Sequence, residues 1–154
     1  MVSRDYTNLL RHGLIHHYDG GREQATRQLA LAHRDMASAR RLMAEDRDWA
    51  FAITYNGVLQ AGRALMLYEG YRATSGEGGH VAVIRFCEVY FGQRYRGEME
   101  LFDRMRVTRT RVVYEVSGSI SHHEAQEAFL FAESFVRRIA AIIEPGGAQE
   151  PHRQ

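Results

Sequence analysis

Apolar residues recur at intervals of three and four along most of the chain, and this spacing predicts amphipathic helices. The pattern is clearest between residues 22 and 45, where one stripe of small and aliphatic side chains faces a core. The stripe consists of Leu29, Ala32, Met36, Ala39 and Met43. The other faces of this segment are polar and rich in arginine, so we expect a helix with one buried face.

The segment from Trp49 to Tyr68 is apolar on nearly every side, which predicts a central helix. Asp48 is a candidate N-cap, and Gly70 is a candidate end, because glycine readily adopts the left-handed conformation that follows many helices. One small bundle has few neighbours to cover such a helix. We therefore expect a homodimer, in which a second copy covers part of it.

Further helices are predicted from similar stripes, at residues 3–17, 81–91 and 98–116. The last helix begins at Ser121, which forms a capping box with Glu124, and it stops at Pro145. Residues 72–80 are rich in turn formers and predict a loop. The fold class expected is all-α, an up-and-down bundle of about five to six helices. We expect a helical N-terminal extension (1–21), the bundle (22–144) and a disordered tail (145–154).

Composition excludes several kinds of chemistry. All 20 basic residues are arginines, which removes lysine Schiff bases and the lysine of a phosphate-binding P-loop. The single cysteine, Cys87, excludes an internal disulfide framework and any site with several cysteine ligands. No apolar run reaches the length of a membrane span, so we expect a cytoplasmic protein without a membrane partner, and no metal or cofactor is expected. The net charge of +1 argues against indiscriminate DNA binding but permits a local basic patch.

An arginine-rich segment, "DRMRVTRTRVVYE" at residues 103–115, is the first candidate site. Its basic and aromatic members are Arg104, Arg106, Arg109, Arg111 and Tyr114. Guanidinium groups match phosphate oxygens, and a tyrosine can stack on a base or donate a hydrogen bond, so phosphate recognition is one interpretation. The alternative is a solvated helix face balanced by nearby acids. Those acids are Glu98, Glu100 and Asp103.

Several other polar positions are candidate sites. In "SGEGGH" the backbone amides could bind an anion beside His80, or the segment could be a flexible turn. On the central helix Asn56, Gln60 and Arg63 interrupt the apolar surface near Tyr55, and we expect them to hydrogen-bond to neighbouring helices or at a subunit interface. His122 and His123 cannot both face one ion from adjacent helical positions, so they predict a solvated helix start.

The segments "DWAFAITYNGVLQAGRALMLYEGYRATSGEGGHVAVIRF", "FDRMRVTRTRVVYE" and "ISHHEAQEAFLFAESFVRRI" together resemble the small prokaryotic HEPN-domain proteins. The resemblance covers residues 22–143. It implies a helical bundle that forms a homodimer, with the arginine-rich helices facing a shared cleft. It also implies frequent pairing with a small nucleotidyltransferase in toxin–antitoxin modules.

Active members of that family cleave RNA without a metal. Their signature, on the arginine-rich helix, is an arginine followed by four to six residues and then a histidine. Here the arginines match as Arg104, Arg106, Arg109 and Arg111, and the tyrosine matches as Tyr114. The resemblance makes Arg109 and Tyr114 the catalytic candidates, with the other arginines and His80 binding RNA or a nucleotide. No histidine matches, and Thr110 cannot shuttle a proton near neutral pH, so binding is expected and cleavage is doubtful. The alternative is a non-catalytic helical partner of a nucleotidyltransferase.

The stretch "RHGLIHHY", Arg11 to Tyr18, satisfies the arginine–histidine spacing but lies before the bundle. With so many arginines and histidines in the chain, such matches arise by chance. We interpret the stretch as a helix end that docks through Leu9, Leu10, Leu14 and Ile15. Its charged groups should then face water.

Overall fold

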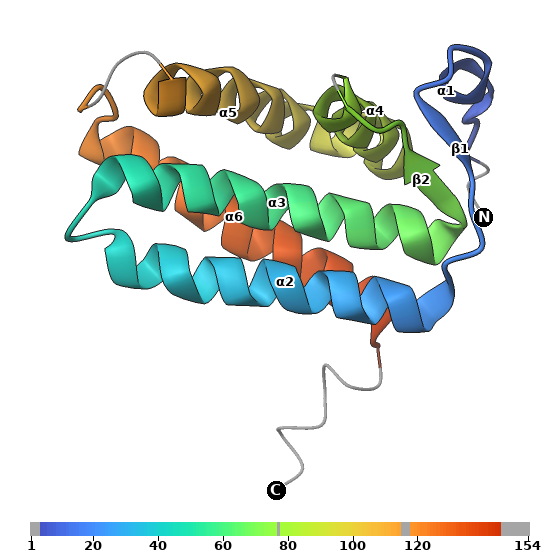
Figure 1. Ribbon diagram of the computed structural model, residues 1–154, viewed down its shortest axis with the longest axis horizontal. Helices are drawn as coiled ribbons and strands as arrows, with labels where there is room; N and C mark the ends of the chain where they lie inside the picture. The colour runs from blue at the N-terminus through green and yellow to red at the C-terminus, as the bar shows by residue number, and fades with distance from the viewer. Residues whose placement is uncertain (1–3, 77, 115–117, 146–154) are drawn as a thin grey trace, which may run out of the picture.

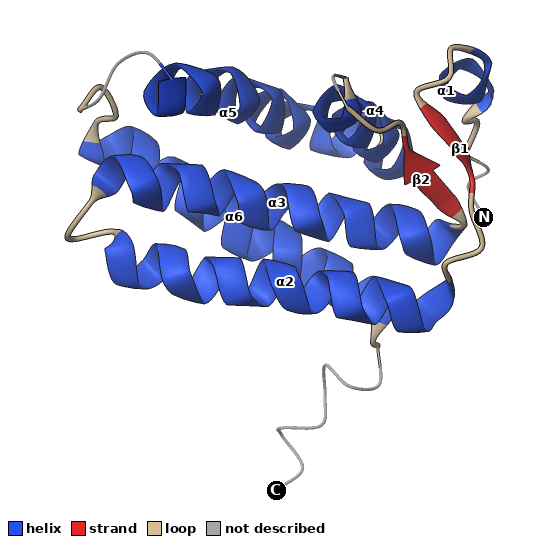
Figure 2. Ribbon diagram, in the orientation of Figure 1, coloured by secondary structure: helices blue, strands red, loops and turns tan. Residues whose placement is uncertain are grey.

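The computed structural model describes residues 4–76, 78–114 and 118–145. Helices account for most of these residues, and one pair of short strands lies at one end of the bundle (Figures 1 and 2). In chain order the elements are α1 (Thr7–Arg11), β1 (Ile15–His17), α2 (Gly21–Leu42), α3 (Arg47–Glu69), β2 (Tyr71–Ala73), α4 (Gly79–Phe91), the 3₁₀ turn η1 (Gln93–Tyr95), α5 (Arg96–Tyr114) and α6 (His122–Ile143). The predicted all-α helical bundle is confirmed.

Helix α3 forms the centre of the bundle. In Figure 1 it runs between α2 and α5, antiparallel to α2, with α6 behind it. Its N-cap is Asp46, whose carboxylate accepts a hydrogen bond from the Trp49 amide at 3.2 Å, so the prediction of Asp48 was wrong by two residues. At its other end Gly70 adopts a left-handed conformation with φ of 95°, as the sequence predicted.

The homodimer was predicted because a single bundle was expected to leave part of this apolar helix uncovered. Within the single chain, however, α2, α4, α5 and α6 all pack against α3, and thirteen of its residues are buried. Trp49 is its only large apolar side chain that remains mostly exposed, at 56 %. The apolar surface of α3 therefore no longer supports a homodimer. The homodimer stays a prediction that rests on the resemblance to HEPN-domain proteins.

The N-terminal region differs from the single helix predicted over residues 3–17. Helix α1 ends at Arg11, Gly13 takes a positive φ of 70°, and Ile15–His17 pairs antiparallel with Tyr71–Ala73 (Figure 2). The glycine breaks the helix because its backbone is free to turn there. Part of the loop predicted at 72–80 is consequently the strand β2.

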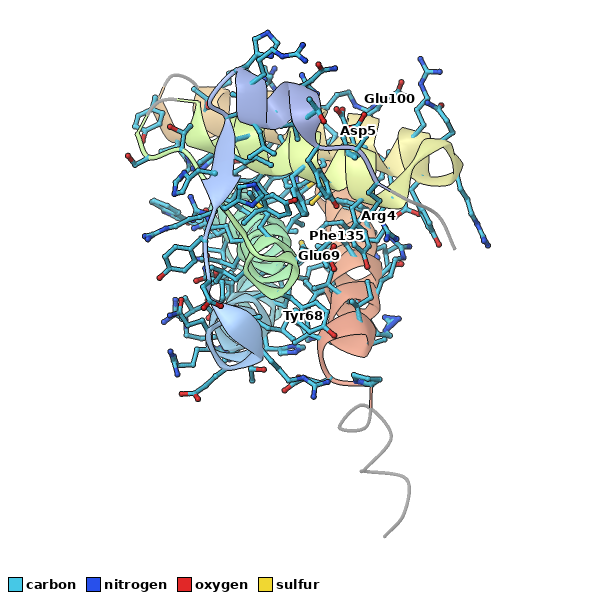
Figure 3. All side chains as sticks on the ribbon, turned by 90° about the vertical axis from the view of Figure 1, so that its right-hand side faces the viewer. Arg4, Asp5, Tyr68, Glu69, Glu100 and Phe135 are labelled. Carbon is cyan, nitrogen blue, oxygen red and sulfur yellow. The ribbon has the colours of Figure 1, made fainter. Side chains whose placement is uncertain are left out.

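Figure 3 looks onto this end of the bundle, where Arg4 and Glu69 are labelled. Arg4 donates from Nε to the Tyr90 carbonyl at 2.9 Å, and its guanidinium lies 3.8 Å from the centre of the Tyr90 ring. Leu9 and Ile15 are buried in the core, as the docking interpretation expected. The N-terminal segment is thus anchored on α4 and β2.

Helices α5 and α6 complete the bundle. The capping box at the start of α6 is confirmed, with Ser121 and Glu124 exchanging hydrogen bonds of 3.0 Å. On α5, Met105 and Val112 are buried in the core, and the last two residues of the helix predicted at 98–116 lie outside the described residues. The same holds for residues 146–154, most of the predicted tail. Within the described part of the chain, no helix has both the length and the apolarity that crossing a membrane requires.

Candidate functional site

Helix α5 presents its arginines in two directions. Arg106 and Arg109 are half-buried against the bundle, whereas Arg104 and Arg111 are exposed, as is Tyr114 at 72 %. His80, on the first turn of α4, is also half-buried, and both arginines lie near enough to lower its pKa. The structure therefore brings together three of the six predicted site residues and separates the other three.

A tyrosine–histidine pair lies at the centre of this group. The Tyr55 side chain, fully buried in α3, has its hydroxyl 3.0 Å from Nδ1 of His80. The guanidinium carbon of Arg109 lies 5.8 Å from the centre of the Tyr55 ring, a cation–π contact. Helices α3, α4 and α5 thus each contribute one residue to a single polar site in an otherwise apolar interior.

Electrostatic effects extend this site to Arg63. Burial lowers the pKa of His80, and the charges of Arg63, Arg109 and Arg106 lower the pKa further. Burial also raises the pKa of Tyr55 to about 12 against the opposing effect of the same arginines. Both rings are therefore uncharged at neutral pH. We call Arg63, Arg106 and Arg109, gathered around Tyr55 and His80, the arginine cluster.

The cluster carries more positive charge than the described carboxylates neutralise. Asp103 pairs with Arg106 at 3.1 Å, but neither Arg63 nor Arg109 forms an ion pair with a described residue. Among the acids proposed to balance this helix, Glu98 instead pairs with Arg138, and Glu100 with Arg96. The three positive charges of the cluster are consequently balanced by one described carboxylate, that of Asp103.

The Nε atom of Arg109 is buried and has no hydrogen-bond partner among the described residues. A buried donor without a partner costs about 1–3 kcal/mol, more when the group is charged. Thr110, compared above with a catalytic histidine, is exposed and donates to the Arg106 carbonyl at 3.2 Å. The unsatisfied hydrogen-bonding group at this site is therefore a positively charged donor on Arg109, and an anion is the kind of ligand that accepts from such a donor.

A cleft of about 450 Å³ adjoins the cluster. Its polar wall consists of Arg63, Arg72 and the uncharged His80, and Arg63 also belongs to the cluster. Its apolar wall comes from Met66, Leu67 and Ala73. The "SGEGGH" loop contributes Ser75, Gly76 and Gly79, while Glu77 lies outside the described residues.

The exposed residues of α5 form a separate surface. Arg104, Val107, Arg111 and Tyr114 follow at intervals of three and four and are all exposed, with Val107 at 55 %. We call these four residues the outer stripe. A mixture of arginine, aromatic and aliphatic side chains is typical of protein–protein interfaces and differs from the half-buried cluster.

The other histidine-rich segments lie elsewhere. His16 and His17 are exposed on β1, and His122 and His123 are exposed at the start of α6. The structure therefore agrees with the interpretation of the second pair as a solvated helix start. Among the described residues no group of three or more histidine, cysteine, aspartate and glutamate side chains is close enough to hold a metal ion.

Sequence reasoning missed Tyr55, Arg63 and Arg72 as site residues. A signal for two of them was present, because Arg63 and its neighbour Tyr55 interrupt an apolar helix. Of the polar positions noted there, Gln60 does bond to a neighbouring helix, accepting from the Gln28 side chain. Arg72 gave no signal, since it lies in a strand that was predicted as a loop.

Comparisons with protein-family models, with curated proteins and with solved structures found no match for this chain.

Proposed function

We propose that this protein binds the phosphate groups of RNA or of a nucleotide through the arginine cluster. The observation that carries the proposal is that Arg63, Arg106 and Arg109 gather around the Tyr55–His80 pair, while Asp103 is the one described carboxylate that pairs with any of them. Like charges held this close repel one another, and burial removes the water that would screen them. A bound phosphate would relieve both costs, because it supplies negative charge and several acceptor oxygens.

The resemblance to HEPN-domain proteins supports the same ligand class and extends the proposal. On that basis we propose a cytoplasmic homodimer in a toxin–antitoxin or nucleotidyltransferase-linked system. Cleavage is not part of the proposal, because Thr110 replaces the family's histidine. We expect no cleavage of single-stranded RNA above background in a metal-free assay at neutral pH.

The proposal is tested by fluorescence anisotropy with a labelled single-stranded RNA of about 12 nucleotides. Affinity should fall steeply between about 50 and about 200 mM salt. Arg109→Ala should weaken binding and flatten the slope of log affinity against log salt by about one unit, the amount expected for one lost phosphate contact. Arg106→Ala should act in the same direction.

Arg137→Ala is the matched control. Arg137 is exposed on α6, so this substitution removes the same charge from another surface. It should leave the affinity and the salt slope nearly unchanged. Equal losses in Arg109→Ala and Arg137→Ala would show a general charge effect and contradict the proposal. Absence of RNA and nucleotide binding by the folded wild-type protein would contradict it as well.

The outer stripe supports a second candidate function. Its exposed arginines and apolar side chains suit docking on an acidic protein surface, such as that of a partner nucleotidyltransferase. In this case Arg104→Ala with Arg111→Ala should weaken the complex with that partner, whereas Arg109→Ala should not. RNA binding by the isolated protein separates the two candidates, because only the first requires it.

A further inference from the structure

We propose that the cleft beside the arginine cluster is the subsite for one nucleotide unit, a ribonucleoside monophosphate that is either free or at the end of an RNA. This inference rests on the proposed function and assigns the ligand to a particular place. The cleft lies between α2, α3, β2 and the start of α4; it shares Arg63 with the cluster and contains His80, around which the cluster gathers. Its ligand is therefore held from one side by the same positive charge.

The two walls of the cleft match the two halves of a nucleotide. The phosphate would lie against Arg63, Arg72 and His80, and the base against Leu67 and Ala73. A volume of about 450 Å³ is within the range of small-molecule sites, roughly 300 to 1,000 Å³. An inorganic anion would leave the apolar wall uncovered, so the cleft favours a ligand with a ring as well as a charge.

The fold positions Arg72 in the polar wall, and no described carboxylate pairs with either arginine of that wall. The Arg72 guanidinium lies 5.0 Å from the centre of the Tyr18 ring, and β2 is fixed by its pairing with β1. Neither Arg63 nor Arg72 forms an ion pair with a described residue. Burial lowers the pKa of Arg63, because the guanidinium group is partly desolvated. A phosphate would replace that lost hydration with charge-assisted hydrogen bonds.

The tyrosine–histidine pair supplies a directed donor. When the Tyr55 hydroxyl donates to Nδ1 of His80, the ring proton is on Nε2, which is free to donate to a phosphate oxygen. On the other side, the Gln28 amide is held by its hydrogen bond to Gln60 and offers a polar edge to a base. Polar groups that are oriented before binding reduce the entropy that the ligand complex loses.

The test is isothermal titration calorimetry of the full chain with AMP, GMP, CMP and UMP, and separately with inorganic phosphate and with adenosine. At least one monophosphate should bind more tightly than phosphate or adenosine. Arg72→Ala should weaken that binding by about tenfold, the loss expected for one charge-assisted hydrogen bond. Ser75→Trp, which adds an indole to the exposed rim of the cleft, should abolish it.

Two controls match these variants. Arg137→Ala removes an exposed arginine elsewhere, and Ala37→Trp adds an indole to an exposed position of α2. Both should bind the monophosphate as the wild type does, and thermal unfolding checks that every variant is folded. Competition identifies the source of the nucleotide, because a site for an RNA end predicts that the monophosphate displaces labelled RNA, and a free-nucleotide site predicts that it does not.

The outcomes separate this inference from the proposed function. RNA binding that depends on Arg109, with no monophosphate binding tighter than phosphate, would overturn the nucleotide subsite and leave the proposed function standing. Monophosphate binding that is indifferent to Arg72→Ala and Ser75→Trp would also overturn it, since the ligand would then bind elsewhere. Failure of both RNA and nucleotides to bind would overturn both proposals.

Discussion

A single methyl group added at Gly62 tests how α4, and with it His80, is positioned. Gly62 lies in the middle of α3, and a Cβ built there would be 2.6 Å from Cγ1 of Val83 on α4. Carbon atoms in contact are normally about 3.5–4.0 Å apart, so one helix must move by about 1 Å or Val83 must change rotamer. Valine has little rotamer freedom in a helix, which makes movement of α4 the expected response.

Two opposing effects set the magnitude. Overpacking of a core costs about 1–3 kcal/mol, and replacing glycine by alanine in a helix gains about 1 kcal/mol. We expect Gly62→Ala to lower the free energy of unfolding by about 1 kcal/mol, measured by urea denaturation. Gly57→Ala is the matched control in the same helix. A Cβ there would meet Sδ of Met36 at 2.9 Å, near the end of a flexible side chain that can move away.

Gly57→Ala should consequently leave the stability unchanged or raise it by up to about 1 kcal/mol. A double-mutant cycle with Val83→Ala sharpens the test, because removing the clashing methyl groups should restore part of the stability lost in Gly62→Ala. A coupling energy of about 1 kcal/mol is expected between the two positions. The reasoning would be refuted by Gly62→Ala being as stable as Gly57→Ala, with no coupling to Val83.

Three other predictions concern the titration of His80, the opening histidines and the oligomeric state. Because the folded protein lowers the pKa of His80 below its usual 6.5, the unfolded chain binds more protons, and the free energy of unfolding should fall as the pH drops through 6.5. His80→Gln should reduce this fall between about pH 7.5 and about pH 5.5 in urea denaturation, and an unchanged pH dependence would contradict the assignment. His16→Ala with His17→Ala should not alter RNA affinity, since both side chains are exposed on β1; a loss of affinity without a change in melting temperature would mean that they belong to the site. Light scattering at micromolar concentration should give the mass of a homodimer, and a monomer mass would refute that prediction.

Local sequence signals predicted the long helices well. The stripe of Leu29, Ala32 and Met36 is buried on α2, and the capping box of Ser121 and Glu124 begins α6. In each case the residues that form the signal lie within a few positions of one another along the chain, so the signal can be recognised in the sequence without knowledge of the fold.

The strand pair and the composition of the site could not be predicted in this way. Ile15–His17 shows no alternation long enough to indicate a strand, and it pairs only because the end of α3 brings residues 71–73 beside it. The sequence identified the arginines of α5 as a group. Which of them are half-buried and which are exposed depends on contacts with residues that are distant in the sequence. Arg109 is half-buried and lies over Tyr55, whereas Arg104 is exposed and forms no cation–π contact with a described ring.

The pairing of β1 with β2 also constrains the order in which the chain can fold. Ile15 is made early by the ribosome, but its partner Ala73 follows only after α2 and α3 have been synthesised. Contacts between residues so far apart form late, because closing a long loop costs chain entropy before any contact is gained. During synthesis β1 therefore stays unpaired until α2 and α3 have formed, and the strand that carries Arg72 is fixed only when Ile15–His17 pairs with it.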